Sequence, residues 1–81
     1  MDQDKKIEEV ARQVISKLIH VASDKIDPNA HFIKDLGVDS IDAIQLSVAL
    51  EKNFNITIDD TVINELSTIN STVKVVSQLM K

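Results

Sequence analysis

The most informative part of this 81-residue sequence is Asp35-Leu36-Gly37-Val38-Asp39-Ser40-Ile41-Asp42-Ala43-Ile44-Gln45-Leu46. It contains the only glycine of the chain, and Gly37 suits a tight turn that needs a positive φ angle. Asp39 is a good helix N-cap, which would place Ser40 at the first helical position with its hydroxyl at an exposed end. No proline or glycine follows as far as Phe54, so the sequence predicts a helix of about four turns over 40–54.

The predicted helix 40–54 has two apolar faces, whereas a helix in a small domain normally needs only one. At about 100° per residue, one arc is typical of a core stripe. It consists of Ala43, Leu46, Leu50 and Phe54. The second arc consists of Ile41, Ile44 and Val48, next to Ser40, Ser47 and Glu51. Apolar surface left over in this way often marks a docking site, but the arc could equally pack beneath a neighbouring helix.

Three further segments have helical patterns. Apolar residues recur at steps of three and four from Ile7 to Val21, which predicts an amphipathic helix of about four to five turns. A weak helical segment covers 61–66, and a last helix runs over 69–80 behind a cap at Ser67 or Thr68. We therefore expect an all-α fold, a small bundle of three main helices plus one short helix. It would form a single domain over 1–81, with 1–4 frayed.

The segment between the first two predicted helices, 23–38, is long for so small a domain. Asp27-Pro28-Asn29 marks a turn within it. A loop of this length usually has a function or internal anchors. The expected anchors are its apolar side chains Ile26, Phe32, Ile33 and Leu36.

Composition excludes several classes of function. There is no cysteine, which rules out disulfides and thiolate metal sites. No apolar run approaches the ~18 residues of a membrane span, and the N-terminus is too polar for a signal peptide, so a cytoplasmic location is the default expectation. Phe32 and Phe54 are the only aromatic residues, so base stacking on a nucleic acid is not expected.

The net charge of −4 is concentrated in the middle of the chain. Residues 35–65 carry seven acidic side chains against Lys52 alone, whereas acids and bases balance over 1–34. An acidic middle around Ser40 argues against nucleic acid and for basic protein partners. A charge run of this kind is also common on a solvated face without any partner.

Ser40 is a poor candidate for a catalytic nucleophile. A nucleophilic serine needs a base within hydrogen-bond reach, and both histidines, His20 and His31, precede the motif. A bundle of this size also offers little room for a substrate cleft. Asp35, Asp39 and Asp42 lack an organised cation-binding loop, so no metal site is expected. The sequence therefore favours a protein that is not an enzyme.

Asp39-Ser40-Ile41 behind Asp35-Leu36-Gly37 resembles the modification motif of acyl carrier proteins, in its common Asp-Leu-Gly-x-Asp-Ser form. The resemblance runs from Asn29 to the second half of the last helix, and more loosely over the whole chain. It implies that Ser40, next to Asp39, receives 4′-phosphopantetheine from coenzyme A through a separate phosphopantetheinyl transferase. The terminal thiol of that arm would then carry acyl groups as thioesters in fatty acid biosynthesis or a related pathway.

The resemblance also implies binding surfaces. Acyl-transferring and ketosynthase-type enzymes with basic surfaces would contact an acidic and apolar face on a monomeric carrier. That face would consist of Asp39, Ile41, Asp42, Ile44, Gln45, Val48 and Glu51. The acyl chain would lie between the helices, in a cavity lined by Phe32, Leu46 and Ile63.

The sequence departs from housekeeping fatty-acid carriers at several positions. Gln45, Lys52 and Asn53 stand where glutamate is usual, Ser47 where an apolar residue is common, and Asp59 where proline is frequent. A specialised carrier for a polyketide, a modified lipid or an aminoacyl pathway is therefore an alternative. From a different class, the chain could be a helical adaptor that binds a partner through Ile41, Ile44 and Val48.

Overall fold

The computed structural model describes residues 2–80 and contains four α-helices in this part of the chain. They are α1 (Asp2–Ile19), α2 (Ser40–Phe54), α3 (Asp60–Ile63) and α4 (Ile69–Leu79). A 3-10 helix, η1 (Ser23–Lys25), lies in the connection between α1 and α2. No strand forms within residues 2–80. The predicted bundle of three main helices and one short helix is confirmed, although residues 2–4 of the end expected to fray belong to α1.

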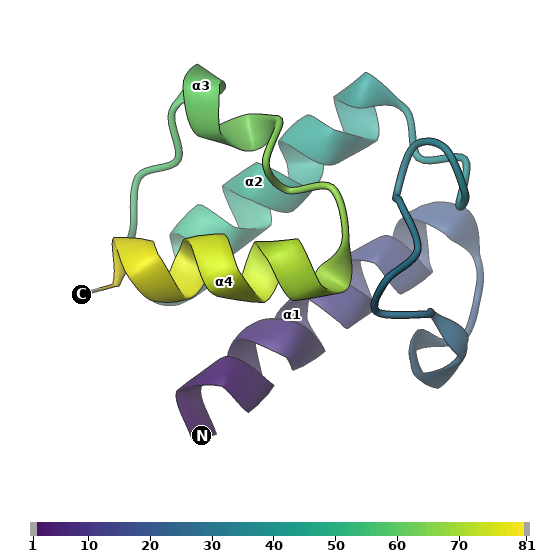
Figure 1. The fold of residues 1–81 in the computed structure, drawn as a ribbon, viewed down its shortest axis with the longest axis horizontal. Coiled ribbons are helices and arrows are strands. Elements are labelled where there is room, and N and C mark those ends of the chain that lie inside the picture. The colour runs from purple at the N-terminus through teal and green to yellow at the C-terminus, as the bar shows by residue number, and fades with distance from the viewer. Residues whose placement is uncertain (1, 81) are drawn as a thin grey trace.

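The helices are arranged around α1, which packs against both α2 and α4, while α3 packs against α2 (Figure 1). α1 ends at Ile19, and His20 follows it in the left-handed conformation with φ 60°. The long connection then leads back to α2 at one end of the bundle (Figure 1). This arrangement places the start of α2 beside the connection that precedes it.

The helical part of the core consists of fully buried aliphatic side chains from the three long helices. They are Ile7, Ala11 and Ile15 of α1, Leu46 and Leu50 of α2, and Ile69 and Val76 of α4. Of the core stripe predicted on α2, Leu46 and Leu50 are confirmed, whereas Ala43 and Phe54 are only half-buried. Burial of these apolar surfaces supplies most of the driving force for folding.

Two buried polar residues, Ser47 and Thr72, were not expected in the core. The Ser47 hydroxyl donates to the Ile44 carbonyl at 2.7 Å, and the Thr72 hydroxyl donates to the Thr68 carbonyl at 2.7 Å. Each hydroxyl is therefore satisfied within its own helix, which removes most of the cost of burying it.

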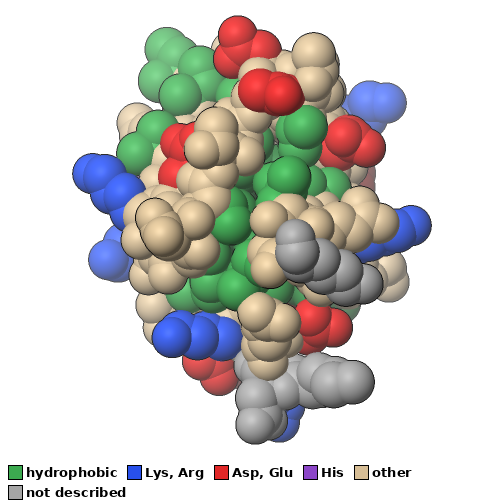
Figure 2. Space-filling view, turned by 90° about the vertical axis from the view of Figure 1, so that its left-hand side faces the viewer, with side chains coloured by type: hydrophobic (Ala, Val, Ile, Leu, Met, Phe, Trp, Pro, Cys, Tyr) green, Lys and Arg blue, Asp and Glu red, His purple; other side chains and the backbone are tan. Residues whose placement is uncertain are grey.

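Seen from the end of the bundle where α4 finishes, hydrophobic side chains occupy the middle of the face between acidic and basic ones (Figure 2). At the end of α4, Met80 packs against the core, whereas Leu79 is 38% exposed. The cap of this helix is Thr68, whose side chain accepts from the Ser71 amide while Ser71 accepts from the Thr68 amide.

The connection between α1 and α2 is anchored by buried side chains. Ile26 and Phe32 are buried as predicted, and Leu36 is half-buried. The prediction for Ile33 is wrong, because 52% of its surface is exposed, and Val38 is the third buried anchor instead. The backbone turn over 31–36 directs Ile33 outward and Val38 inward, which the composition of the loop does not reveal.

Arg12 of α1 also binds the connection between α1 and α2. Its Nη1 donates to the carbonyl oxygens of Ser23 and Ile26 at 2.8 and 2.7 Å. Its Nε pairs with Glu8 Oε2 at 2.7 Å, one turn away on α1. One guanidinium group thus binds both ends of the segment that contains η1.

We expect Arg12→Met to lower the free energy of unfolding by about 1–3 kcal/mol, because two charge-assisted hydrogen bonds to the backbone are lost. Urea unfolding followed by circular dichroism measures the change. Glu8→Gln is the matched control, since it removes only an exposed helix ion pair worth about 0.3–0.5 kcal/mol. Equal losses for the two variants would assign the effect to the ion pair and not to the loop contacts.

Candidate functional site

The turn predicted before Ser40 and the helix predicted to start at Ser40 are both present in the structure. Gly37 adopts φ 75°, in the region where side chains other than glycine are strained. Asp39 is the N-cap of α2, and its Oδ1 accepts from the Asp42 amide at 2.8 Å. Ser40 is the first residue of α2 and is exposed. The Ser40 hydroxyl therefore lies at the accessible, positive end of the helix dipole.

The segment before Gly37 is tied to the segment after α3. The Phe32 amide donates to the Ser67 carbonyl at 2.8 Å, and the Val38 amide donates to the Phe32 carbonyl at 2.9 Å. His31 of this segment is half-buried. Its Nδ1 accepts from the amides of Ile33 and Lys34, both at 3.2 Å. These contacts hold in place the backbone segment that precedes Ser40.

The second apolar arc of α2 is exposed. Ile41 is 67% exposed, Ile44 52% and Val48 41%, so no helix among the described residues covers it. The interpretation that this arc packs beneath a neighbouring helix of residues 2–80 is therefore wrong. We call these three side chains the exposed strip. Asp39 and Gln45 are exposed near it, and Asp42 is half-buried.

Glu51, predicted to share this surface, has a structural contact instead. Its Oε2 accepts from the Ile58 amide at 2.8 Å, and the side chain is half-buried. Its backbone carbonyl accepts from the amides of Asn55 and Ile56 where α2 ends. Glu51 thus fastens the connector after α2 to the helix, which its spacing from Ser40 could not indicate.

A pocket of about 280 Å³ lies between the start of α2, α3 and the connection that carries Phe32. Its apolar lining consists of Phe32, Ile33, Ala43, Ile44, Ile63 and Leu66. Ser40 also lines it, and since Ser40 is exposed, the serine lies at the rim. Of the three predicted cavity residues, Phe32 and Ile63 line this pocket. Leu46 does not, because it is fully buried in the core beneath.

α3, which forms one wall of this pocket, begins behind the N-cap Asp59. The Asp59 carboxylate accepts from the Thr61 side chain and from the amides of Thr61 and Val62. The side-chain hydrogen bond from Thr61, followed by those from the two amides, lowers the pKa of Asp59. A carboxyl group whose pKa is lower in the folded state stabilises the fold above its unfolded pKa. That contribution is lost as the pH falls through the folded pKa.

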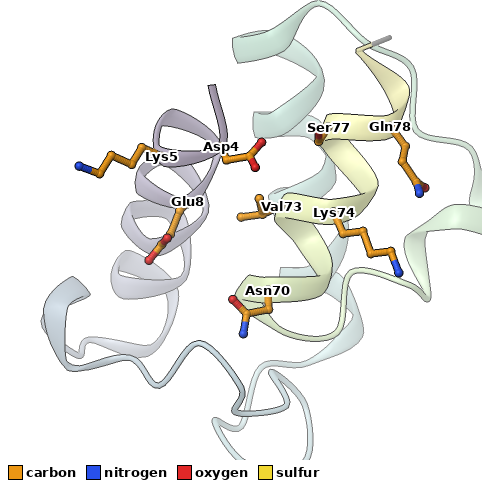
Figure 3. A pocket seen from close by; sticks show the side chains of 8 residues that line it. All are labelled: Asp4, Lys5, Glu8, Asn70, Val73, Lys74, Ser77 and Gln78. Carbon is orange, nitrogen blue, oxygen red and sulfur yellow. The ribbon is translucent and has the colours of Figure 1, made fainter. Parts of the chain in front are cut away.

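A larger, open groove of about 540 Å³ lies between α1 and α4 (Figure 3). Most of the residues that line it are polar or charged, and none of them was predicted as a site residue. Lys5 and Lys74 point out of it in opposite directions (Figure 3). Its two cationic side chains therefore do not converge on a common ligand, and we assign the candidate site to the smaller pocket beside Ser40.

Neither a metal cluster nor a membrane span is found in the described part of the chain. Across residues 2–80, no three His, Cys, Asp or Glu side chains are grouped so that they could hold a metal ion. In the same range no helix has the length and apolar character needed to cross a bilayer.

Comparison with known proteins identifies the family. A family model described as "Phosphopantetheine attachment site" matches residues 9–76. An acyl carrier protein of Akkermansia muciniphila is 37% identical over 76 residues, which cover 94% of this chain and 95% of that protein. The range matched by the family model, 9–76, includes Gly37, Asp39 and Ser40. The chain therefore belongs to the acyl carrier protein family, whose members hold 4′-phosphopantetheine covalently on a serine and are not themselves enzymes.

Proposed function

We propose that Ser40 is the residue to which 4′-phosphopantetheine is attached, and that the chain carries acyl intermediates as thioesters on this arm. The observation that carries the proposal is the position of Ser40. It is exposed at the first residue of α2, directly behind the capping Asp39, and within the region matched by the family model. The arm supplies the thiol that forms the thioester, and the chain itself has no cysteine.

The residues around Ser40 would both attract and repel the phosphodiester of such an arm. The start of α2 presents free backbone amides and the positive end of the helix dipole to the phosphodiester. Asp39 uses its carboxylate to cap the Asp42 amide, so it orients the helix start. The negative charges of Asp39 and Asp42 oppose the phosphodiester, which keeps the arm from being pinned to the protein.

The exposed strip is the proposed contact surface for the phosphopantetheinyl transferase and for acyl-processing enzymes. Its large exposed apolar side chains would be buried on binding, with Asp39, Asp42 and Gln45 at the margin. Glu51 is left out of this surface, because its carboxylate is held by the Ile58 amide. The pocket beside Ser40 is the proposed acyl cavity, lined by Phe32 and Ile63 and also by Ala43 and Leu66.

Fatty acid biosynthesis or a related pathway is the process we propose, with a specialised polyketide, lipid or aminoacyl carrier as the alternative. Gln45, Lys52 and Asn53 are all exposed on α2. Because housekeeping carriers usually have glutamate at these positions, a partner enzyme would meet a less acidic surface on this chain. A helical adaptor would use the same exposed strip without any modification of Ser40. The cytoplasmic location, the monomeric state and the single domain over 1–81 stay predictions.

The carrier function is tested by incubating the unmodified protein with coenzyme A, Mg²⁺ and a broad-specificity phosphopantetheinyl transferase. Intact-mass measurement is expected to detect the gain of one phosphopantetheine group, and peptide mapping is expected to place it on Ser40. An unmodified chain would support the adaptor, and modification at another serine would overturn the assignment.

The pathway is addressed by restoring glutamate at Gln45, Lys52 and Asn53, which changes the net charge by −4 relative to the unaltered sequence. Exposed charges act mainly on association rates and are screened by salt. We expect a housekeeping malonyl transferase or ketosynthase to use the triple variant faster than the unaltered carrier at low ionic strength. This advantage should shrink as salt is added.

The matched control places the same charge change on other helices, with glutamate at Gln13, Lys74 and Gln78, which are all exposed on α1 and α4. If both triple variants react at the same increased rate, total charge and not the α2 surface is responsible. Equal rates for the α2 variant and the unaltered carrier at low salt would remove the main support for a specialised carrier.

A further inference from the structure

The turn over 31–36 is closed at its start by the imidazole of His31. Its Nδ1 accepts from the amides of Ile33 and Lys34, both at 3.2 Å. Among residues 2–80, neither amide has another hydrogen-bond acceptor. The ring therefore caps these two amides, as a serine or aspartate side chain caps the first amides of a helix.

These two hydrogen bonds determine which ring nitrogen of His31 carries the proton. An amide can donate only to a nitrogen that has a free lone pair, so Nδ1 is unprotonated and the proton of the neutral ring is on Nε2. A protonated imidazole has an N–H group at both positions and accepts no hydrogen bond. Protonation of His31 therefore removes the cap and leaves the two amides facing a third donor.

The charged groups around His31 are mainly acidic. Asp35 accepts from the His31 amide through Oδ2 at 2.8 Å, and Asp60 of α3 lines the same pocket as His31. The pocket residues that come from α2 and from the segment after α3 are uncharged. Lys34 is the only other basic residue of the turn, and it is exposed. Two carboxylates against one ammonium group favour a positive imidazole, so the cost of protonation falls on the cap.

We propose that His31 is a pH-sensitive cap, which holds the turn over 31–36 closed while the ring is neutral and releases it when the ring is protonated. The turn contains Phe32, whose amide donates to the Ser67 carbonyl at 2.8 Å and whose carbonyl accepts from the Val38 amide at 2.9 Å. Release of the turn therefore loosens the backbone that leads to the start of α2. The proposal concerns the protein before any modification and does not depend on attachment at Ser40.

The test follows the unmodified protein by NMR between about pH 5.5 and 8, the range in which histidine side chains ordinarily change charge. Long-range ¹H–¹⁵N correlations of the His31 ring report its tautomer and its protonation. Exchange with water measures the protection of the Ile33 and Lys34 amides. At pH 8 we expect the Nε2–H tautomer and two protected amides. As the ring becomes protonated, the protection of each amide should fall about two- to tenfold, as expected for the loss of one hydrogen bond.

Three variants separate the cap from its titration. His31→Asn keeps a side-chain oxygen that can cap the same amides but does not titrate, so protection should be retained at every pH. His31→Ala has no cap, so protection should be low at every pH. His20→Asn is the matched control, because it removes the only other histidine, and asparagine tolerates the left-handed backbone at that position. This control should respond to pH as the unaltered protein does.

A proton on Nδ1 of His31 at pH 8 would overturn the proposal, as would a ring that does not titrate in this range. Amides that stay protected after the ring is protonated would also overturn it, and so would a pH response that persists in His31→Asn or disappears in His20→Asn. The amide of Leu50 in the core is the internal reference, and an equal loss there would indicate general unfolding instead of a local release. Failure of Ser40 to accept the arm would leave all of these measurements unchanged.

Discussion

Replacing Ser40 with alanine is expected to abolish attachment of 4′-phosphopantetheine completely and to leave the fold unchanged. In the transfer, the Ser40 oxygen forms a bond to the pyrophosphate phosphorus of coenzyme A that bears the pantetheine group. The bond from this phosphorus to the bridging oxygen of the pyrophosphate breaks, and adenosine 3′,5′-bisphosphate leaves while the hydroxyl proton passes to a base on the transferase. Alanine has no oxygen to form that bond. Since Ser40 is exposed, its loss should change the free energy of unfolding by no more than about 0.5 kcal/mol.

Intact mass after incubation with coenzyme A and a transferase measures the effect, and thermal unfolding verifies the fold. Ser23→Ala is the matched control, because Ser23 also begins a helical segment, η1, but no acidic residue caps it. The control should be modified as fully as the unaltered protein. Attachment to the Ser40→Ala variant would show that another residue is the acceptor.

Asp39 allows its structural role to be separated from its charge. Asparagine caps a helix about as well as aspartate, so Asp39→Asn should keep the stability of α2. Asp39→Ala loses the cap on the Asp42 amide and should cost about 0.5–2 kcal/mol. If the Asp39→Asn variant is modified more slowly at unchanged stability, the transferase recognises the negative charge of Asp39. If only Asp39→Ala is slowed, the cap is what matters.

Leu50→Ala is expected to produce the largest loss of stability among the substitutions considered, about 2–5 kcal/mol. Leu50 is fully buried among side chains of the core, and its truncation leaves a cavity that the surrounding helices fill only in part. A chain of this length has a total stability on the order of 4–12 kcal/mol, so much of it would be lost. Urea unfolding measures the change.

Val48→Ala is the matched comparison, two residues away on the same helix. Val48 is 41% exposed, so its truncation removes little buried surface and should cost less than about 1 kcal/mol. Because Val48 belongs to the exposed strip, the same variant should be modified more slowly. If Val48→Ala destabilises the protein more than Leu50→Ala, the division of α2 into a core face and a contact face is wrong.

Features that depend only on neighbouring residues could be predicted from the sequence. The positive φ of Gly37, the Asp39 cap and the position of Ser40 all follow from local backbone preferences. The long helices follow from apolar periodicity, which also separated Leu46 and Leu50 from the exposed strip on α2. These signals work without knowledge of the fold, because a turn, a cap or a helix face is defined within a few residues.

Contacts between residues far apart in the chain could not be predicted in this way. The loop contacts of Arg12 and the bond from the Ile58 amide to Glu51 join positions whose approach depends on how the connections fold back. The same is true of the pocket, which Ser40 and Ala43 line and Leu46 does not. A cavity is the space that several packed elements leave between them, so its walls and its volume exist only once the helices and the loop have been placed.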